Sequence, residues 1–255
     1  MLSIRKAVSQ GVEVISSNTI IIFPILLYSI FVSLVVAFSF MPILGTSQVD
    51  LMAIDLSLLA RNTDALFGAL IIDALFLLIL GAFFNSITLS MIKEGWKRGI
   101  TGFALSFGST YFAPILGVTL AKGLITGCLL SLAALPLFIG PSVPAVIISA
   151  TSVFLLVIVL LGLFWVKESV VAENKGVAAA LRNSWNFTRL NLYGTIMIIA
   201  AVAALEMMAF ASRQSVPQAA TPITPLIGVI ALFLELFLSA TAKSVKLAAY
   251  LETHK

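Results

Sequence analysis

Charged residues are scarce in this chain. Only 10% of its 255 residues are Asp, Glu, Lys or Arg, whereas 60% are hydrophobic. A soluble domain typically carries about 25% charged residues, so this composition excludes a water-soluble globular fold. The sequence therefore predicts an integral membrane protein whose apolar surface is covered mainly by lipid.

Cysteine and histidine are almost absent, since the chain has one of each, Cys128 and His254. A single cysteine excludes an intramolecular disulfide, and one terminal histidine excludes an intramembrane serine–histidine pair and disfavours a Cys/His metal site. The sequence also lacks GxSxG, HExxH, a Walker loop and a dinucleotide-binding fingerprint. We therefore expect a protein that is not an enzyme and that uses no cofactor and no metal.

Six apolar runs are long enough to cross a bilayer. They occupy residues 20–44, 65–92, 111–139, 143–165, 190–212 and 224–243. The first run is too long for the apolar part of a cleavable signal peptide, and a polar amphipathic stretch precedes it. The expected fold is an all-α integral membrane protein, a single membrane domain over 1–255 with six transmembrane helices.

The basic residues predict which side of the membrane the chain ends face. If the N-terminus is cytoplasmic, only Arg61, Lys122 and Arg213 of the 15 basic residues fall outside the cytoplasmic segments. Lysine and arginine concentrate in cytoplasmic loops of membrane proteins. The sequence therefore predicts a multi-pass protein of the plasma or inner membrane with both termini in the cytoplasm.

Three stretches, 3–17, 93–109 and 165–193, are expected to be amphipathic helices lying in the cytoplasmic membrane interface. Their apolar faces are formed by residues at helical spacing: Ile4, Val8, Val12 and Ile15; Trp96, Ile100, Phe103 and Phe107; and Val177, Leu181, Trp185 and Thr188. Four glycines weaken the second helix, because each costs up to about 1 kcal/mol relative to alanine.

The same stretches suggest an internal repeat. They contain Lys6-Ala7-Val8, Arg98-Gly99-Ile100 and Lys175-Gly176-Val177, each a basic, a small and a β-branched residue ahead of two spans. We interpret this as a triplicated unit of interfacial helix plus hairpin, over 1–92, 93–165 and 166–255. The alternative is that every cytoplasmic entry into the membrane attracts a basic residue.

Four ionisable residues fall inside the predicted spans: Asp73, Lys122, Glu206 and Glu235. Such residues are costly in lipid and usually face the bundle interior with a partner. At 1.5 Å per residue, Lys122 and Glu235 lie about 16 Å and about 12 Å from the cytoplasmic ends of their helices, so they could meet. Three interpretations are open: a structural pair that fixes helix register, a site on a transport pathway, or side chains that simply extend to the membrane surface. Asp73 and Glu206 lie in the outer half, within reach of Arg61 or Arg213.

Gly123 and Gly127 form a GxxxG pattern in the third span. This pattern predicts close helix packing, within the chain or between two copies, although glycine is also generally enriched in membrane helices. All three tryptophans, Trp96, Trp165 and Trp185, are expected in an aromatic belt at the cytoplasmic interface.

Clustered basic residues beside tryptophan at a membrane surface favour contact with anionic lipid headgroups. The candidate contacts are Lys97, Arg98, Lys175, Arg182, Arg189, Trp96 and Trp185. Because a membrane belt explains these residues, nucleic acid is not an expected partner.

Residues 164–192 also carry a family resemblance. The residues concerned are Val170-Val171, Glu173, Lys175-Gly176-Val177, Ala180-Leu181, Ser184-Trp185 and Thr188, before Asn191. This segment resembles one in the membrane domain of glycerophosphoryl diester phosphodiesterases and in related six-helix proteins, including the uncharacterised YciC-like inner-membrane family. The sequence lacks the soluble phosphodiesterase domain, so the resemblance implies a shared membrane bundle and not that activity.

The expected function is a non-enzymatic transport or lipid-handling component of the membrane. The alternative is a structural subunit or assembly scaffold of a larger membrane complex, and a third, less favoured interpretation is a membrane enzyme with an unrecognised site. Expected partners are membrane lipids and either a second copy of the chain or other membrane subunits.

Overall fold

A computed structural model describes residues 4–44, 63–103, 105–140, 142–214 and 224–253. Within these ranges every regular element is helical. Five helices are long and apolar enough to cross a membrane, or six if the bent pair of Ile4–Ser17 with Thr19–Val35 counts as one span. The all-helical, membrane-type fold expected from the composition is therefore confirmed.

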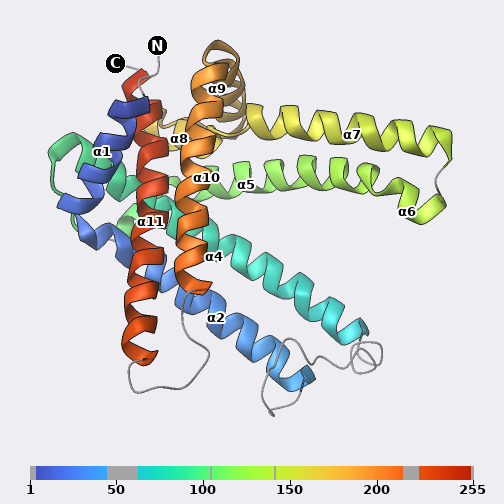
Figure 1. Cartoon of the computed structure of the whole chain (residues 1–255), viewed down its shortest axis with the longest axis horizontal. Helices are drawn as coiled ribbons and strands as arrows, with labels where there is room; N and C mark the ends of the chain where they lie inside the picture. The colour runs from blue at the N-terminus through green and yellow to red at the C-terminus, as the bar shows by residue number, and fades with distance from the viewer. Residues whose placement is uncertain (1–3, 45–62, 104, 141, 215–223, 254–255) are drawn as a thin grey trace.

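The long helices form three hairpins that diverge from a common base (Figure 1). The first pairs α2 (Ile22–Leu44) with α4 (Thr63–Arg98), the second pairs α5 (Ser106–Ala133) with α7 (Val143–Gly162), and the third pairs α10 (Leu192–Gln214) with α11 (Thr224–Thr253). A short helix, α6 (Leu135–Ile139), forms the tip of the second hairpin together with Gly140, which has φ +83°.

The common base, which we call the hub, is the main folded core. It is built from α1 (Ile4–Ser17), α8 (Val166–Glu173), α9 (Val177–Leu190) and the ends of the long helices nearest to them. Ile15, Met91, Val170 and Leu247 are fully or almost fully buried there. The hairpin tips, in contrast, expose large apolar side chains such as Phe138 at 81%, which suits helices surrounded by lipid rather than by protein.

A sharp elbow separates α1 from the first hairpin. The axes of Ile4–Ser17 and Thr19–Val35 differ by 92°, with a 3-10 turn, η1 (Thr19–Ile21), between them. The buried Asn18 side chain at this elbow donates to the carbonyl oxygens of Val14 and Gly99, each at 3.0 Å, and accepts from the backbone N–H of Thr101 at 2.8 Å. One amide therefore ties this elbow to the link between α4 and α5.

Two of the expected interfacial helices differ from the prediction. Residues 93–109 do not form a helix of their own, because α4 continues to Arg98 and α5 begins at Ser106. Gly99 interrupts the helix at φ +77°, a conformation that favours glycine. The 165–193 stretch is two helices, α8 and α9, separated at Asn174, which is left-handed at φ 54°. Helix α1 matches the predicted 3–17 helix closely.

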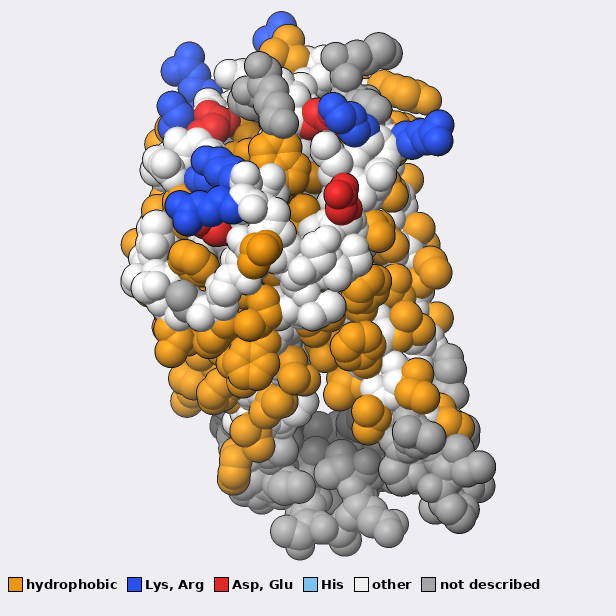
Figure 2. Space-filling view, turned by 90° about the vertical axis from the view of Figure 1, so that its left-hand side faces the viewer, with side chains coloured by type: hydrophobic (Ala, Val, Ile, Leu, Met, Phe, Trp, Pro, Cys, Tyr) orange, Lys and Arg blue, Asp and Glu red, His pale blue; other side chains and the backbone are white. Residues whose placement is uncertain are grey.

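Among the described residues, exposed charge is concentrated at one end of the molecule. Figure 2 shows lysine, arginine and acidic side chains gathered at the top, with a wide apolar band below them. The exposed basic residues of the hub lie on α1, at the end of α4 and on or beside α8 and α9: Arg5, Lys6, Lys97, Arg98, Lys175, Arg182 and Arg189. The hub is therefore polar on its outer surface and apolar where the hairpins leave it.

Candidate functional site

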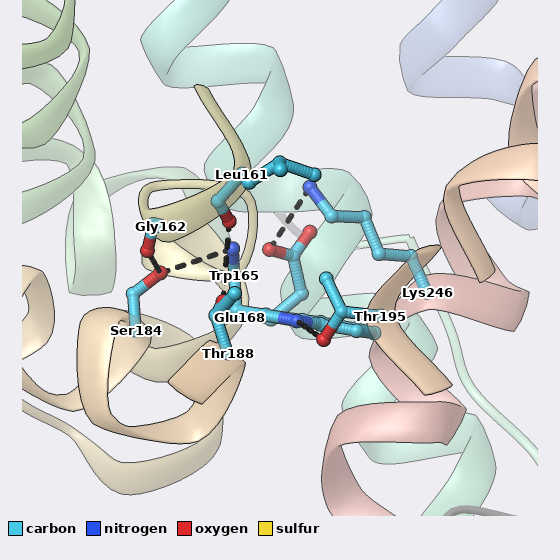
Figure 3. A network of polar contacts seen from close by, with 8 residues as sticks. All are labelled: Leu161, Gly162, Trp165, Glu168, Ser184, Thr188, Thr195 and Lys246. Carbon is cyan, nitrogen blue, oxygen red and sulfur yellow. Dashed lines mark hydrogen bonds and ion pairs between the residues drawn. The ribbon is translucent and has the colours of Figure 1, made fainter. Parts of the chain in front are cut away.

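Trp165 lies at the centre of the hub, between α7 and α8, and is 0% exposed. Its indole Nε1–H donates to Thr195 Oγ1 at 3.0 Å (Figure 3). The ring makes edge contacts with Phe164 and Phe187 and a tilted contact with Tyr250, with centroid distances between 4.9 and 6.0 Å. The expectation that Trp165 belongs to a membrane-interface belt is wrong, because its hydrogen bond and its aromatic neighbours bury it in protein.

Ser184 and Thr188 explain how the chain can break between α7 and α8. Ser184 Oγ donates to the Gly162 carbonyl at 2.7 Å and accepts from the Trp165 N–H at 3.1 Å, while Thr188 Oγ1 donates to the Leu161 carbonyl at 3.1 Å. A helix end leaves carbonyl groups without partners. The two hydroxyls, one turn apart on α9, satisfy carbonyl groups at the end of α7.

Helix α8 carries one member of a buried ion pair. Glu168 is only 3% exposed. Its Oε2 lies 3.2 Å from Nζ of Lys246 on α11, and the two form a salt bridge. The same ammonium lies over the Phe164 ring, 4.1 Å from its centroid. Figure 3 shows Lys246 extending toward Glu168 from a different element of the hub. This pair therefore joins the last hairpin to α8.

The charges of this ion pair also act on two further lysines. The charges of Lys246 and Glu168 act on the Lys122 amine of α5. The same two charges act on the Lys167 amine of α8, together with those of Lys243 and Lys122. Both side chains are partly buried. Among the described residues, neither amine makes a hydrogen bond or an ion pair. We call Lys122, Lys167, Lys246 and Glu168 the lysine cluster.

Lys93 plays a different part, at the other end of α8. Lys93 is only 9% exposed. Its ammonium donates to the Val171 carbonyl, to Asn174 Oδ1 at 3.3 Å and to Tyr111 Oη at 3.1 Å. A cation is favourable at a helix C-terminus. Lys93 therefore caps α8 and ties α4 and α5 to it, and its donors are well occupied.

An apolar cavity of about 330 Å³ lies where α7, α9 and α10 meet. Its lining combines aliphatic side chains with one aromatic ring and one guanidinium: Ile158, Leu161, Gly162, Trp185, Thr188, Arg189 and Leu192. Trp185 is 43% exposed and stacks directly over Gly162, where an added Cβ would lie 2.2 Å from the ring. Two of the candidate headgroup contacts, Trp185 and Arg189, are thus brought together at one cavity.

The other candidate headgroup contacts lie apart from this cavity. Lys97, Arg98, Lys175 and Arg182 are exposed on the hub surface, and Arg98 pairs with Glu94 at 2.8 Å. Trp96 is partly buried and lines a small polar cavity of about 220 Å³ between α1 and the end of α4, with Gln10 and Glu13. Arg182 lies two helical turns from Arg189 on the same helix.

The four intramembrane ionisable residues do not converge on one site. Glu235 lines a cavity of about 770 Å³ between α2 and α11, with Tyr28, Ser29 and Ser33. Glu235 lies eleven residues from Lys246, about 16 Å along α11. The charges that act on Lys122 are those of Lys246 and Glu168. Among the described residues, no ion pair or hydrogen bond joins Lys122 to Glu235.

The two remaining acids have partners from the neighbouring helix. Asp73, 7% exposed, accepts from Ser39 Oγ at 2.7 Å, and Glu206 accepts from Ser239 Oγ at 3.3 Å. The Glu206 charge also acts on Lys243. The predicted partner Arg61 lies outside the described residues, as does the side chain of Arg213.

Gly123 and Gly127 make no close helix contact within the described chain, since nothing lies within 4 Å of a Cβ added at either position. Close packing occurs instead at Gly11 against Val245, Gly117 against Val177 and Gly162 against Trp185. Packing of the GxxxG face against another chain stays a prediction.

Sequence reasoning missed Glu168, Lys167 and the cap formed by Ser184. A signal for the cap was present, because Ser184 and Thr188 have the four-residue spacing that places two hydroxyls on one helical face. Glu168 was also visible as the acid next to Lys167 at the end of a span. Its partner Lys246, however, is 78 positions away, and periodicity carries no information about that contact.

Comparison with known proteins gives no further guide to the site. No protein-family model, no curated protein and no solved structure matches the chain. Within the described ranges, no group of three or more His, Cys, Asp and Glu side chains could hold a metal ion.

Proposed function

We propose that this protein is a non-enzymatic, lipid-handling component of the membrane, with six spans and with the hub and both chain ends on the cytoplasmic side. The high density of exposed basic residues on the hub supports that orientation, because such residues are retained on the cytoplasmic side. Helix α1, bent by 92° from the first hairpin, and helix α9, with exposed Arg182 and Arg189, would lie in the interface. The resemblance to the YciC-like bundle and the triplicated unit are part of the same proposal.

The cavity beside Trp185 and Arg189 is the observation that carries lipid handling. Its aliphatic side chains can contact an acyl chain, and its guanidinium can bind a phosphate. Its tryptophan ring is of the kind enriched at the level of the lipid headgroups. A volume of about 330 Å³ holds only part of a lipid. We therefore expect the headgroup and the first part of one chain to bind there, while the rest of the lipid stays in the bilayer.

Native mass spectrometry of the protein released from nanodiscs tests this proposal by counting bound lipids. Arg189→Gln is expected to weaken retention of phosphatidylglycerol about fivefold, since one basic residue near a membrane surface contributes about 1 kcal/mol. Arg182→Gln is the matched control, because it removes the same charge from the same helix outside the cavity. Equal retention by both variants and the unchanged protein would contradict the proposal.

A structural subunit is the second candidate, favoured by the second hairpin. Only 11% of the apolar stretch within Ser106–Ala133 is buried inside the described chain. No atom of the described chain lies within 4 Å of a Cβ added at Gly123 or Gly127, so the GxxxG face is uncovered. A partner subunit could cover that surface. A single monodisperse species after purification in mild detergent, with no co-purifying subunit and no second copy, would count against this candidate.

A further inference from the structure

The cavity of about 770 Å³ between α2 and α11 lies where the first hairpin contacts the last one. Its polar groups are Glu235 of α11 and Tyr28, Ser29 and Ser33 of α2, and the rest of its described lining is aliphatic side chains and glycine. A few polar groups in an otherwise apolar cavity of this size are typical of small-molecule sites in proteins. The cavity therefore has the volume and the composition of a binding site.

The two serine hydroxyls of this cavity offer hydrogen-bond acceptors to a ligand. Ser29 Oγ donates to the Ile25 carbonyl and Ser33 Oγ donates to the Ser29 carbonyl, each at 3.0 Å. A hydroxyl has one hydrogen, so this donation leaves only the oxygen lone pairs for a ligand. An ionised Glu235 also only accepts hydrogen bonds. Apart from the Tyr28 hydroxyl, which can donate or accept, the polar side chains of the described lining therefore act as acceptors.

The segments that form the cavity contribute one acidic residue and no basic one. Residues 22–44 contain no Asp, Glu, Lys, Arg or His, and Glu235 is the single such residue within 224–242. Ionisable residues inside membrane spans commonly mark substrate or ion sites. The charge of this cavity therefore complements a cation.

The cavity lies at the apolar surface of the two hairpins. Ile30, Leu34 and Leu232, which line it, are between 43% and 46% exposed. The neighbouring Phe233 is exposed as well. Exposed apolar side chains of membrane helices are covered by lipid, so a ligand can reach the cavity from within the bilayer.

We infer that this cavity, which we call the amine cavity, binds an amphipathic amine. Its ammonium group pairs with Glu235, and its apolar body lies along the aliphatic side chains of α2 and α11. An ammonium group donates three hydrogen bonds and accepts none, which complements a carboxylate and two serine oxygens. A zwitterionic phospholipid headgroup fits less well, because its phosphate would meet the same acceptors and no basic residue from either segment.

This inference goes beyond the proposed lipid handling, because it concerns a different cavity and a ligand group of opposite charge. The amine cavity shares no described lining residue with the cavity beside Arg189. The two can therefore fail independently. Loss of the Arg189-dependent retention of phosphatidylglycerol leaves amine binding intact, and an amine cavity without affinity for amines leaves that retention intact.

The test uses the protein in phosphatidylcholine nanodiscs, with dodecylamine as the probe and dodecanol as its uncharged counterpart. Native mass spectrometry counts the bound probe, and the melting temperature gives a second measure of binding. Dodecylamine is expected to bind more tightly than dodecanol and to raise the melting temperature. Glu235→Gln is expected to weaken dodecylamine binding about tenfold or more, which is the loss typical of one hydrogen bond to a charged group. Dodecanol binding is expected to stay the same in that variant.

Three further variants make the result specific. Glu206→Gln is the matched control, because it removes the same charge from α10 outside the amine cavity, and it is expected to bind dodecylamine as the unchanged protein does. Glu235→Asp retains the charge and is expected to bind dodecylamine better than Glu235→Gln does, which separates loss of charge from a folding defect. Ser29→Ala/Ser33→Ala is expected to weaken binding of dodecylamine but not of dodecyltrimethylammonium, whose head cannot donate hydrogen bonds.

Equal binding of dodecylamine and dodecanol by the unchanged protein would overturn the inference, because the charge of the ligand would then play no part. An equal loss in Glu206→Gln and Glu235→Gln would do the same, because any membrane-embedded acid would then explain the attraction. Nanodiscs with added phosphatidylethanolamine test the lipid headgroup as the occupant. If that lipid displaces dodecylamine from the unchanged protein, the cavity binds a phospholipid and the amphipathic amine is wrong.

Discussion

At the scale of single residues, the unequal roles of Glu168 and Lys246 can be measured directly. Glu168→Gln removes the carboxylate that pairs with Lys246 and whose charge also acts on Lys122 and Lys167. Removing one member of a buried ion pair costs about 3–5 kcal/mol. Lys246→Met is expected to cost less, because Lys122 and Lys167 still act on Glu168 and methionine still packs on Phe164. Unfolding followed by denaturant titration in one detergent compares the two.

The double variant Glu168→Gln/Lys246→Met provides the internal control for that comparison. It removes both members of the pair and is expected to be more stable than Glu168→Gln alone, because one of the uncompensated lysines is gone. A larger loss of stability from Lys246→Met than from Glu168→Gln would show that the cluster does not share its single carboxylate.

At the scale of elements, glycine marks where helices of the hub touch. Gly162→Ala places a methyl group 2.2 Å from the Trp185 ring, so the ring or α9 must move, and such overpacking costs about 1–3 kcal/mol. Gly123→Ala is the matched control on α5, where an added Cβ meets nothing within 4 Å. That control is expected to be neutral or to stabilise by up to about 1 kcal/mol, since alanine is the better helix former.

Melting temperatures in detergent compare the two alanine variants, and the double variant Gly162→Ala/Trp185→Ala identifies the cause. If the clash with the ring is responsible, Gly162→Ala costs little once the ring is absent. Strong destabilisation by Gly123→Ala, with Gly162→Ala neutral, would contradict the packing described for the hub. It would point instead to a partner on the open face of the second hairpin.

Hydropathy predicted the long helices because bilayer thickness imposes their length, and the six predicted runs correspond to α2, α4, α5 with α6, α7, α10 and α11. It could not predict how the hub packs. Trp165 and Trp185 look alike in the sequence, yet one is fully buried and the other is 43% exposed. Trp165 is buried beside Thr195, whereas Trp185 packs on Gly162. Both contacts are made by the tertiary fold and cannot be inferred from local sequence. For the same reason, intramembrane position identified Lys122 but not its neighbours Glu168 and Lys246.

At the scale of the whole molecule, the single native cysteine can report how the second hairpin lies in a bilayer. Cys128 is exposed on α5, beyond the hub. If the α5–α7 hairpin spans the bilayer, a nitroxide label on Cys128 is expected to be relaxed strongly by oxygen and weakly by a water-soluble nickel complex in electron paramagnetic resonance.

The control for this measurement is Arg182→Cys in a Cys128→Ser background, which places the label on the charged outer surface of the hub. That label is expected to show the opposite pattern, with strong relaxation by nickel. Nickel relaxing the Cys128 label as strongly as the control would show that the hairpin stays outside the hydrocarbon, and the six-span arrangement would then be wrong.

The contact between the first and last helices determines when the hub can form. Ala7 and Gly11 of α1 pack against α11, an added Cβ on Gly11 would meet Val245, and Lys6 pairs with Glu252. During synthesis, each hairpin can enter the membrane as a local unit, but α1 lacks its main partner until the ribosome has released α11. The first helix to be made therefore completes its packing last, and until then the hub lacks the contact that joins the two ends of the chain.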